Sequence, residues 1–190
     1  MPPAPGGAAR APRGVPRCAS RGTPVHRKRI RKTRAAHPPG ARGLAFNASH
    51  CASLAVIAVA RSGRIGIDVE ALRTVVDAER IATRFFSPQE SAARAALDPA
   101  EQGTGFLNCW TRKEAVVKAL GGGLSIPLHT FAVTLQPRQP AAILTWAIPD
   151  APAAAWQLHQ LEPAAGYVGA LVVERAATLR AWRQWPGPRA

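Results

Sequence analysis

Residues 65–70 alternate between two kinds of side chain, and this constrains the fold more than any other stretch of the chain. Strand side chains repeat every two residues, so three β-branched apolar residues would share one side of a strand here. Gly66, Asp68 and Glu70 would share the other side. We therefore expect a strand with one face packed on a core and the other face left bare and acidic.

The preceding segment predicts a partner for this strand. Order should begin near Leu44, and residues 52–60 form a β-rich apolar run. Residues 61–64 have turn chemistry, so residues 52–70 are interpreted as a hairpin.

Helical patterns follow the hairpin. Residues 77–86 carry apolar side chains at helical spacing, and Ser87 then begins a new helix, with proline at the first position and Glu90 three residues after the cap. A third helix is predicted over roughly 105–120, ending at the glycine run 121–123. Strands are expected near 129–135, 141–148, 155–161 and 167–174. This order of strands, helices and further strands predicts an α+β domain, an antiparallel sheet with packed helices, over residues 44–174.

The ends of the chain differ from this domain. Residues 1–43 hold eleven of the 25 Lys and Arg, eight prolines and no acid, which predicts a disordered basic segment. Its run 26–32 would attract nucleic acid or anionic lipid. The remaining 14 basic and 11 acidic residues nearly balance, so neither nucleic acid nor a membrane is the expected partner of the folded part. Residues 175–190 are interpreted as a loose C-terminal tail.

The three cysteines show no metal-ligand spacing, and no apolar signal segment follows Met1. Free thiols in a reducing cytoplasm are therefore expected.

Trp110, Glu114 and Lys118 share one stripe of the third helix, beside its core stripe. An ordinary surface Glu–Lys pair, worth about 0.3–0.5 kcal/mol, is one interpretation. The chain uses only four lysines against 21 arginines, however, and two of the four lie in this helix. A compact ammonium suits a phosphate oxygen, which favours a functional site at the edge of the buried face.

Asp68 and Glu70 alone would be consistent with a solvated strand face. Together with Glu114 they favour a divalent-cation site, because Mg²⁺ prefers carboxylate oxygens and usually retains water and substrate phosphate. Ser49 and His50 are expected side by side in a loop entering the sheet, where both could donate to a phosphate. A lone histidine is more often structural.

Four motifs occur in one order along the chain. They are Phe-Asn-Ala-Ser-His at 46–50, Gly-Ile-Asp-Val-Glu at 66–70, Arg-Phe-Phe-Ser-Pro-Gln-Glu at 84–90, and Trp-Thr-Arg-Lys-Glu-Ala-Val-Val-Lys at 110–118, followed by Gly-Gly-Leu at 122–124. Over residues 44–172 this pattern resembles the 4′-phosphopantetheinyl transferases, in particular the Sfp-type, holo-acyl-carrier-protein synthase-like subgroup.

The resemblance implies transfer of the phosphopantetheine arm of coenzyme A to a serine of an acyl, peptidyl or aryl carrier protein, with release of 3′,5′-ADP. It implies that Asp68, Glu70 and Glu114 hold Mg²⁺. Lys118 and His50 would contact the coenzyme A phosphates, and Ser49 would support that contact. Glu114 or a metal-bound water would take the proton of the carrier serine.

The resemblance also implies roles for surrounding residues. Lys113 would orient the helix or meet the acidic carrier, and Phe85, Phe86 and the segment 73–105 would face the carrier. The family's two-lobed members carry a first lobe upstream, including a Gly-Lys-Pro element that 37–40 does not match. That lobe is expected to be largely missing, or replaced by the basic segment of a truncated or mis-started reading frame. The exposed apolar strand surface would then favour a homo-oligomer. A rival hypothesis is an impaired transferase fragment that binds carrier domains or nucleic acid without catalysis.

Overall fold

The computed structural model describes residues 44–149, 151–175 and 183. The predicted basic segment and most of the predicted tail lie outside these residues. The described chain is an α+β fold, as predicted. Its elements are β1 (Ala45–Cys51), β2 (Leu54–Ala60), β3 (Ile65–Ala71), α1 (Ala78–Phe85), α2 (Pro88–Ala95), α3 (Pro99–Leu120), β4 (Phe131–Val133), β5 (Ile143–Trp146), β6 (Trp156–Leu161) and β7 (Tyr167–Glu174).

All strand pairs are antiparallel, in three sheets ordered β1-β2, β3-β7-β6 and β4-β5. The predicted hairpin over 52–70 is therefore wrong. Strand β2 pairs with β1 across a tight turn, and β3 pairs with β7, about a hundred residues away in sequence. Local turn chemistry at 61–64 could not reveal this, because β7 lies about a hundred residues further along the chain.

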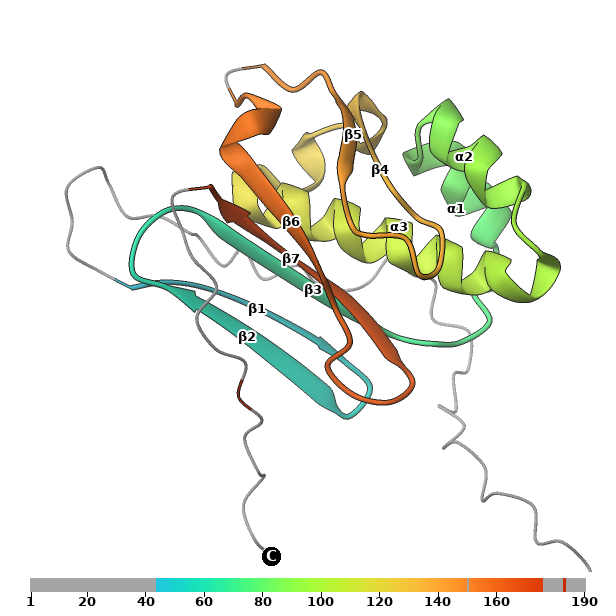
Figure 1. The fold of residues 1–190 in the computed structure, drawn as a ribbon, viewed down its shortest axis with the longest axis horizontal. Coiled ribbons are helices and arrows are strands. Elements are labelled where there is room, and N and C mark those ends of the chain that lie inside the picture. Colours follow the sequence, from blue (N-terminus) through green and yellow to red (C-terminus); the bar gives the residue numbers. More distant parts are fainter. Residues whose placement is uncertain (1–43, 150, 176–182, 184–190) are drawn as a thin grey trace, which may run out of the picture.

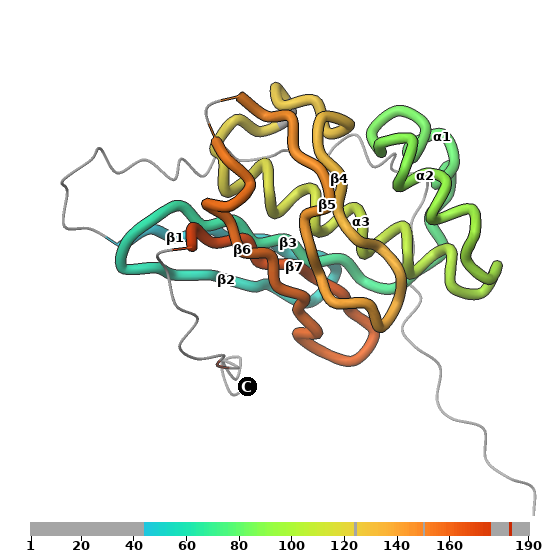
Figure 2. The backbone as a smooth tube through the Cα atoms, turned by 45° about the horizontal axis from the view of Figure 1, so that its top comes forward, coloured from blue at the N-terminus to red at the C-terminus, as the bar shows by residue number. Residues whose placement is uncertain are grey.

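The central sheet lies between two layers (Figure 1). Alternate residues of β7 face opposite sides: Val168, Ala170 and Val172 pack in the larger core with α3, while Leu171 and Val173 pack against the β1–β2 hairpin. Figure 2 shows α1 and α2 beside one end of α3, with β4 and β5 on the side of α3 away from the hairpin. Both faces of β3 are consequently covered.

Helix α3 lies against β3 at Gly66. A Cβ at this position would fall far inside van der Waals distance of the Ala115 carbonyl oxygen and the Ala119 amide nitrogen. Only glycine therefore lets the two backbones meet here, and this close approach brings the polar part of α3 to the acidic face of β3.

The predicted helix signals are largely confirmed. Ser87 and Glu90 form a reciprocal capping box at the start of α2, and α3 ends at Gly121 with a φ of 75°. Helix α3 starts earlier than predicted, at Pro99, and continues through Gly103 and Gly105. Gly105 is buried against Leu97, so tertiary packing outweighs the low helix propensity of glycine.

Candidate active site

Asp68 lies at the centre of the predicted constellation. Its side chain is only 3% exposed, and its Oδ1 accepts hydrogen bonds from Ser49 Oγ and Lys118 Nζ, both at 2.7 Å. Lys118 Nζ also donates to the Ile67 carbonyl oxygen at 2.9 Å. Asp68 Oδ2 is buried and has no hydrogen-bond partner among the described residues. The structure therefore joins Ser49, Asp68 and Lys118 in one buried cluster, with one carboxylate oxygen left over.

Strand β1 reaches β3 through side chains instead of a backbone ladder. Asn47 Oδ1 accepts the Ile67 N–H at 3.0 Å, and Ser49 Oγ accepts the Val69 N–H at 3.3 Å. Two residues further along β3, the Ala71 N–H donates to Cys51 Sγ at 3.4 Å. These side chains repeat every two residues, matching the period of the N–H groups on the free edge of β3. They satisfy that edge and hold the acidic strand in place.

His50 does not join this cluster. Ser49 and His50 lie in a strand, where neighbouring side chains point to opposite faces, so the expectation of a loop that presents both side by side is wrong. Ser49 is buried against Asp68, whereas His50 is exposed on the outer face of the hairpin, opposite Ala55. The predicted phosphate contact of His50 stays a prediction.

The other two acids are also buried. Glu70 is 5% exposed and accepts from the Cys51 thiol at 3.2 Å and from Arg73 at 3.5 Å; Glu114, on α3, is 7% exposed. The expectation of a bare acidic strand face is therefore wrong, because α3 covers it. The two ordinary interpretations fail because α3 and β3 cover each other here. Asp68 and Glu70 are not on a solvated strand face, and Glu114 is not in a solvated Glu–Lys pair on the helix surface.

The donor set suits a divalent cation in its chemistry. Asp68, Glu70 and Glu114 offer carboxylate oxygens of the kind that Mg²⁺ prefers, and Asp68 Oδ2 is an orphaned buried acceptor. As the side chains stand, no group of three His, Cys, Asp or Glu residues in the described part of the chain lies close enough to hold a metal ion. The residues fit such an ion in type, and binding would require their side chains to converge.

Two buried cations on α3 were not recognised as such from the sequence. Lys113 is fully buried and paired with Glu90 at 2.8 Å, so of its two predicted roles the contact with a carrier protein is wrong, while the orientation of the helix stays a prediction. Phe86 is also buried, packed on Phe106, and does not face a partner. Arg112 donates to Thr134 and Gln160, and burial lowers its pKa to about 10. The sequence carried no local signal for this, because the burial of both side chains depends on segments distant in sequence.

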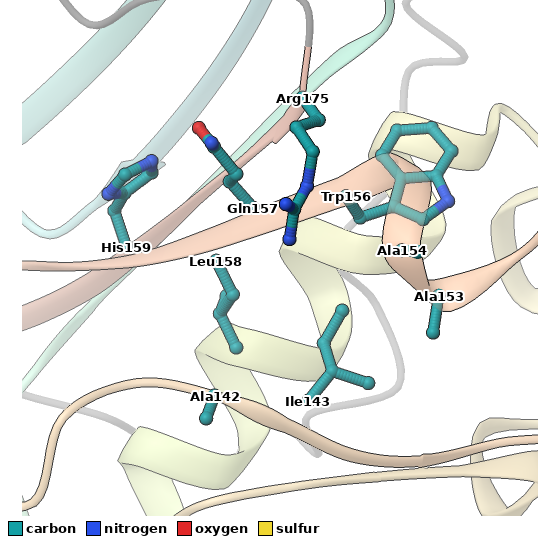
Figure 3. A pocket seen from close by; sticks show the side chains of 9 residues that line it. All are labelled: Ala142, Ile143, Ala153, Ala154, Trp156, Gln157, Leu158, His159 and Arg175. Atoms are coloured by element: carbon teal, nitrogen blue, oxygen red, sulfur yellow. The ribbon is translucent and has the colours of Figure 1, made fainter.

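Two cavities in the described part of the chain lie away from Asp68, Glu114 and Lys118. One, of about 450 Å³, opens between β5 and β6, and Figure 3 shows its nine lining side chains, none of them a predicted site residue. The other, of about 420 Å³, lies between the segment 72–75 and the first turns of α3, and includes Arg73, the partner of Glu70. Neither cavity is the candidate site.

The described cysteines differ in accessibility. Cys51 is half-buried, whereas Cys109 is fully buried, and burial, with a contribution from the Glu90 carboxylate, raises the pKa of the Cys109 thiol well above its usual value. Cys18 lies outside the described residues.

No helix of the described part is long and apolar enough to span a membrane.

In a Cys18→Ser variant, we expect a small thiol reagent to modify Cys51 in the native protein and Cys109 only after unfolding. The raised pKa should keep Cys109 unreactive even at about pH 9, because the thiolate is the reacting species. Mass spectrometry of the labelled peptides measures this. Rapid native labelling of Cys109 would contradict the buried packing of α3.

The comparison with known families bears directly on this cluster. The sequence model of the 4′-phosphopantetheinyl transferase superfamily matches residues 64–172, which include β3 and α3. The chain belongs to this superfamily. Asp68, Glu70, Glu114 and Lys118 all lie inside the matched region, whereas Ser49 and His50 precede it.

Curated relatives agree with the family assignment. The chain is 39% identical over 131 residues to the 4′-phosphopantetheinyl transferase HetI of Nostoc sp. (strain PCC 7120), covering 69% of this chain and 52% of HetI. It is 41% identical over 90 residues to the 4′-phosphopantetheinyl transferase Sfp of Bacillus subtilis (strain 168), covering 47% of this chain and 39% of Sfp. The matched part thus spans about half of HetI and less than half of Sfp.

A solved structure, the apo-ACPS of Chronobacterium ammoiniagenes, is 16% identical and covers 59% of this chain and 95% of its own, with a TM-score of 0.38. At that score the similarity adds nothing to the family assignment.

Proposed function

We propose that this chain transfers the 4′-phosphopantetheine arm of coenzyme A to a serine of an apo carrier protein, with Mg²⁺, releasing 3′,5′-ADP. The observation that supports this most directly is the buried contact of Asp68 with Lys118, both in the family-matched strand and helix, and with Ser49 from β1. Buried carboxylates beside an ammonium suit a substrate that carries a diphosphate, together with its cation.

Asp68, Glu70 and Glu114 would hold the cation. When bound, Mg²⁺ supplies positive charge that neutralises the diphosphate oxygens. Lys118, anchored on β3 by the Ile67 carbonyl, would present its ammonium to a phosphate oxygen. Ser49 keeps the Asp68 carboxylate in place from the β1 side.

The transfer would proceed by in-line displacement. The carrier serine oxygen forms a bond to the phosphorus that bears pantetheine, while the bond from that phosphorus to 3′,5′-ADP breaks. Glu114 would accept the serine proton. Such displacements depend on positioning and charge neutralisation more than on covalent assistance, which the buried acids and Lys118 can provide.

The test is intact-mass spectrometry of an apo acyl carrier protein incubated with this chain, coenzyme A and Mg²⁺. We expect the carrier to gain one phosphopantetheine, and an excess of EDTA to abolish the gain. A folded, soluble chain that leaves the carrier unmodified would contradict the proposal. Salt-sensitive carrier binding without transfer would support the rival hypothesis of a binding module.

The predicted homo-oligomer stays a prediction. The outer face of the hairpin exposes Phe46, Ile57 and Val59 at 53%, 67% and 58%. An exposed apolar patch of this kind is typical of a surface that contacts another protein, such as a second copy of this chain.

A further inference from the structure

One ion pair of the molecule is completely enclosed. Lys113 Nζ lies 2.8 Å from Glu90 Oε2, and both side chains are 0% exposed. The ammonium also donates to the carbonyl oxygens of Leu128, at 2.7 Å, and Phe131, at 2.6 Å, and lies 4.4 Å from the centre of the Phe131 ring. All three of its N–H donors therefore have acceptors.

The Glu90 carboxylate joins three elements. Its Oε2 accepts the Ser87 N–H at the start of α2, at 2.7 Å, and its Oε1 accepts the Val133 N–H of β4, at 2.8 Å. Lys113 adds α3 to this junction. A residue that could have been a helix cap alone thus ties α2, β4 and α3 together.

Stability alone does not explain such a pair. Removing two charges from water costs several kcal/mol per ion, and apolar replacements of buried pairs are often neutral or stabilising. A buried pair with saturated hydrogen bonds does have a defined geometry, which an apolar contact lacks. Its position along α3 indicates what that geometry serves.

Lys113 directly precedes Glu114 and lies five residues before Lys118 on the same helix. On its other side, α3 meets β3 with no spare room at Gly66, and Lys118 contacts Asp68. A small rotation or slide of α3 would therefore change the distance from Lys118 and Glu114 to the acids of β3. The Glu90–Lys113 pair opposes both motions from the opposite side of the helix.

We propose that Glu90 and Lys113 are positioning residues of the candidate active site. They set the rotation and axial position of α3, so that Glu114 and Lys118 meet Asp68. The part of this inference that concerns cation binding and turnover rests on the proposed function. The part that concerns the geometry of α3 against β3 does not.

The test compares two charge-neutralising double variants. Glu90→Gln/Lys113→Met removes the buried pair with near-isosteric side chains. Glu101→Gln/Arg138→Met makes the same chemical change at a pair that also links α3 to a neighbouring segment, but with Arg138 84% exposed. The control pair is distant in sequence from Glu114 and should leave the site unchanged.

Three readouts are measured on each variant: the Lys118–Asp68 distance in a crystal structure, Mn²⁺ affinity by electron paramagnetic resonance, and kcat and KM for coenzyme A. For the buried-pair variant we expect the contact to open beyond 3.5 Å, and Mn²⁺ affinity and kcat to fall at least about tenfold, as for other residues that orient metal ligands. The control should match the wild type in all three.

An unchanged Lys118–Asp68 contact, or a lower melting temperature with unchanged Mn²⁺ affinity and kcat per folded molecule, would overturn the proposal. If the double variant does not fold, Glu90→Asp takes its place, because it keeps both charges but shortens the link by one methylene. Wild-type protein that neither binds Mn²⁺ nor transfers would refute the proposed function. The crystallographic distance would still decide the positioning role.

Discussion

Replacing Glu114 with glutamine is expected to lower the transfer rate at least about 100-fold while the chain stays folded. The substitution keeps the size of the side chain and removes the charge that would hold the cation and accept the serine proton. Glu114 is 7% exposed, so its carboxylate is largely shielded from water. Initial rates of phosphopantetheine transfer to an apo carrier protein, measured over a range of Mg²⁺ concentrations, test this.

Glu162→Gln is the matched control, because Glu162 is exposed and lies outside the cluster. It should retain the wild-type rate. Circular dichroism of both variants should be that of the wild type. Equal rates for Glu114→Gln and wild type would remove Glu114 from the proposed mechanism, whatever the status of the other acids.

Replacing Gly66 with alanine is expected to destabilise the fold by about 3 kcal/mol or more, near the upper end of the range for overpacking. The added methyl group would meet backbone atoms of Ala115 and Ala119, which cannot rotate away as a side chain can. Helix α3 would have to move off β3, and a domain of this size has only about 5–15 kcal/mol of total stability. Urea unfolding followed by tryptophan fluorescence measures the effect.

Gly103→Ala is the control for this change. Gly103 lies in the same helix, and a Cβ there meets no atom within 4 Å. Alanine should therefore stabilise α3 by about 0.5–1 kcal/mol through its higher helix propensity. Similar destabilisation by the two variants would contradict the close contact between α3 and β3.

Several elements could be predicted because their signals are local. The capping box of Ser87 and Glu90 and the helix end at Gly121 depend on groups within four residues of each other. The separation of Asp68 and Glu70 from their apolar neighbours follows from the period of a strand. The order of the motifs was sufficient to indicate the family, which the match over residues 64–172 then established.

Most of the wrong predictions concern partners distant in sequence. The pattern of β3 shows two faces, but not that β7 would pair with it or that α3 would bury its acids. Ser49 and His50 were expected side by side in a loop, but they lie in a strand, whose neighbouring side chains point to opposite faces. The burial of Lys113 depends on Glu90, 23 positions earlier, which no local pattern places beside it.

The sequence by itself thus determined the helix boundaries near 87 and 121, the two-faced strand and the identity of the acids and lysines. The tertiary structure alone decided which of those charges are buried, and which atoms they contact. The physical reason is that propensity and periodicity act over a few residues, whereas the burial of a charge depends on whether distant segments supply its hydrogen bonds. Asp68 shows both effects: the period of the strand places it on the polar face of β3, and Ser49 from β1 and Lys118 from α3 supply its hydrogen bonds.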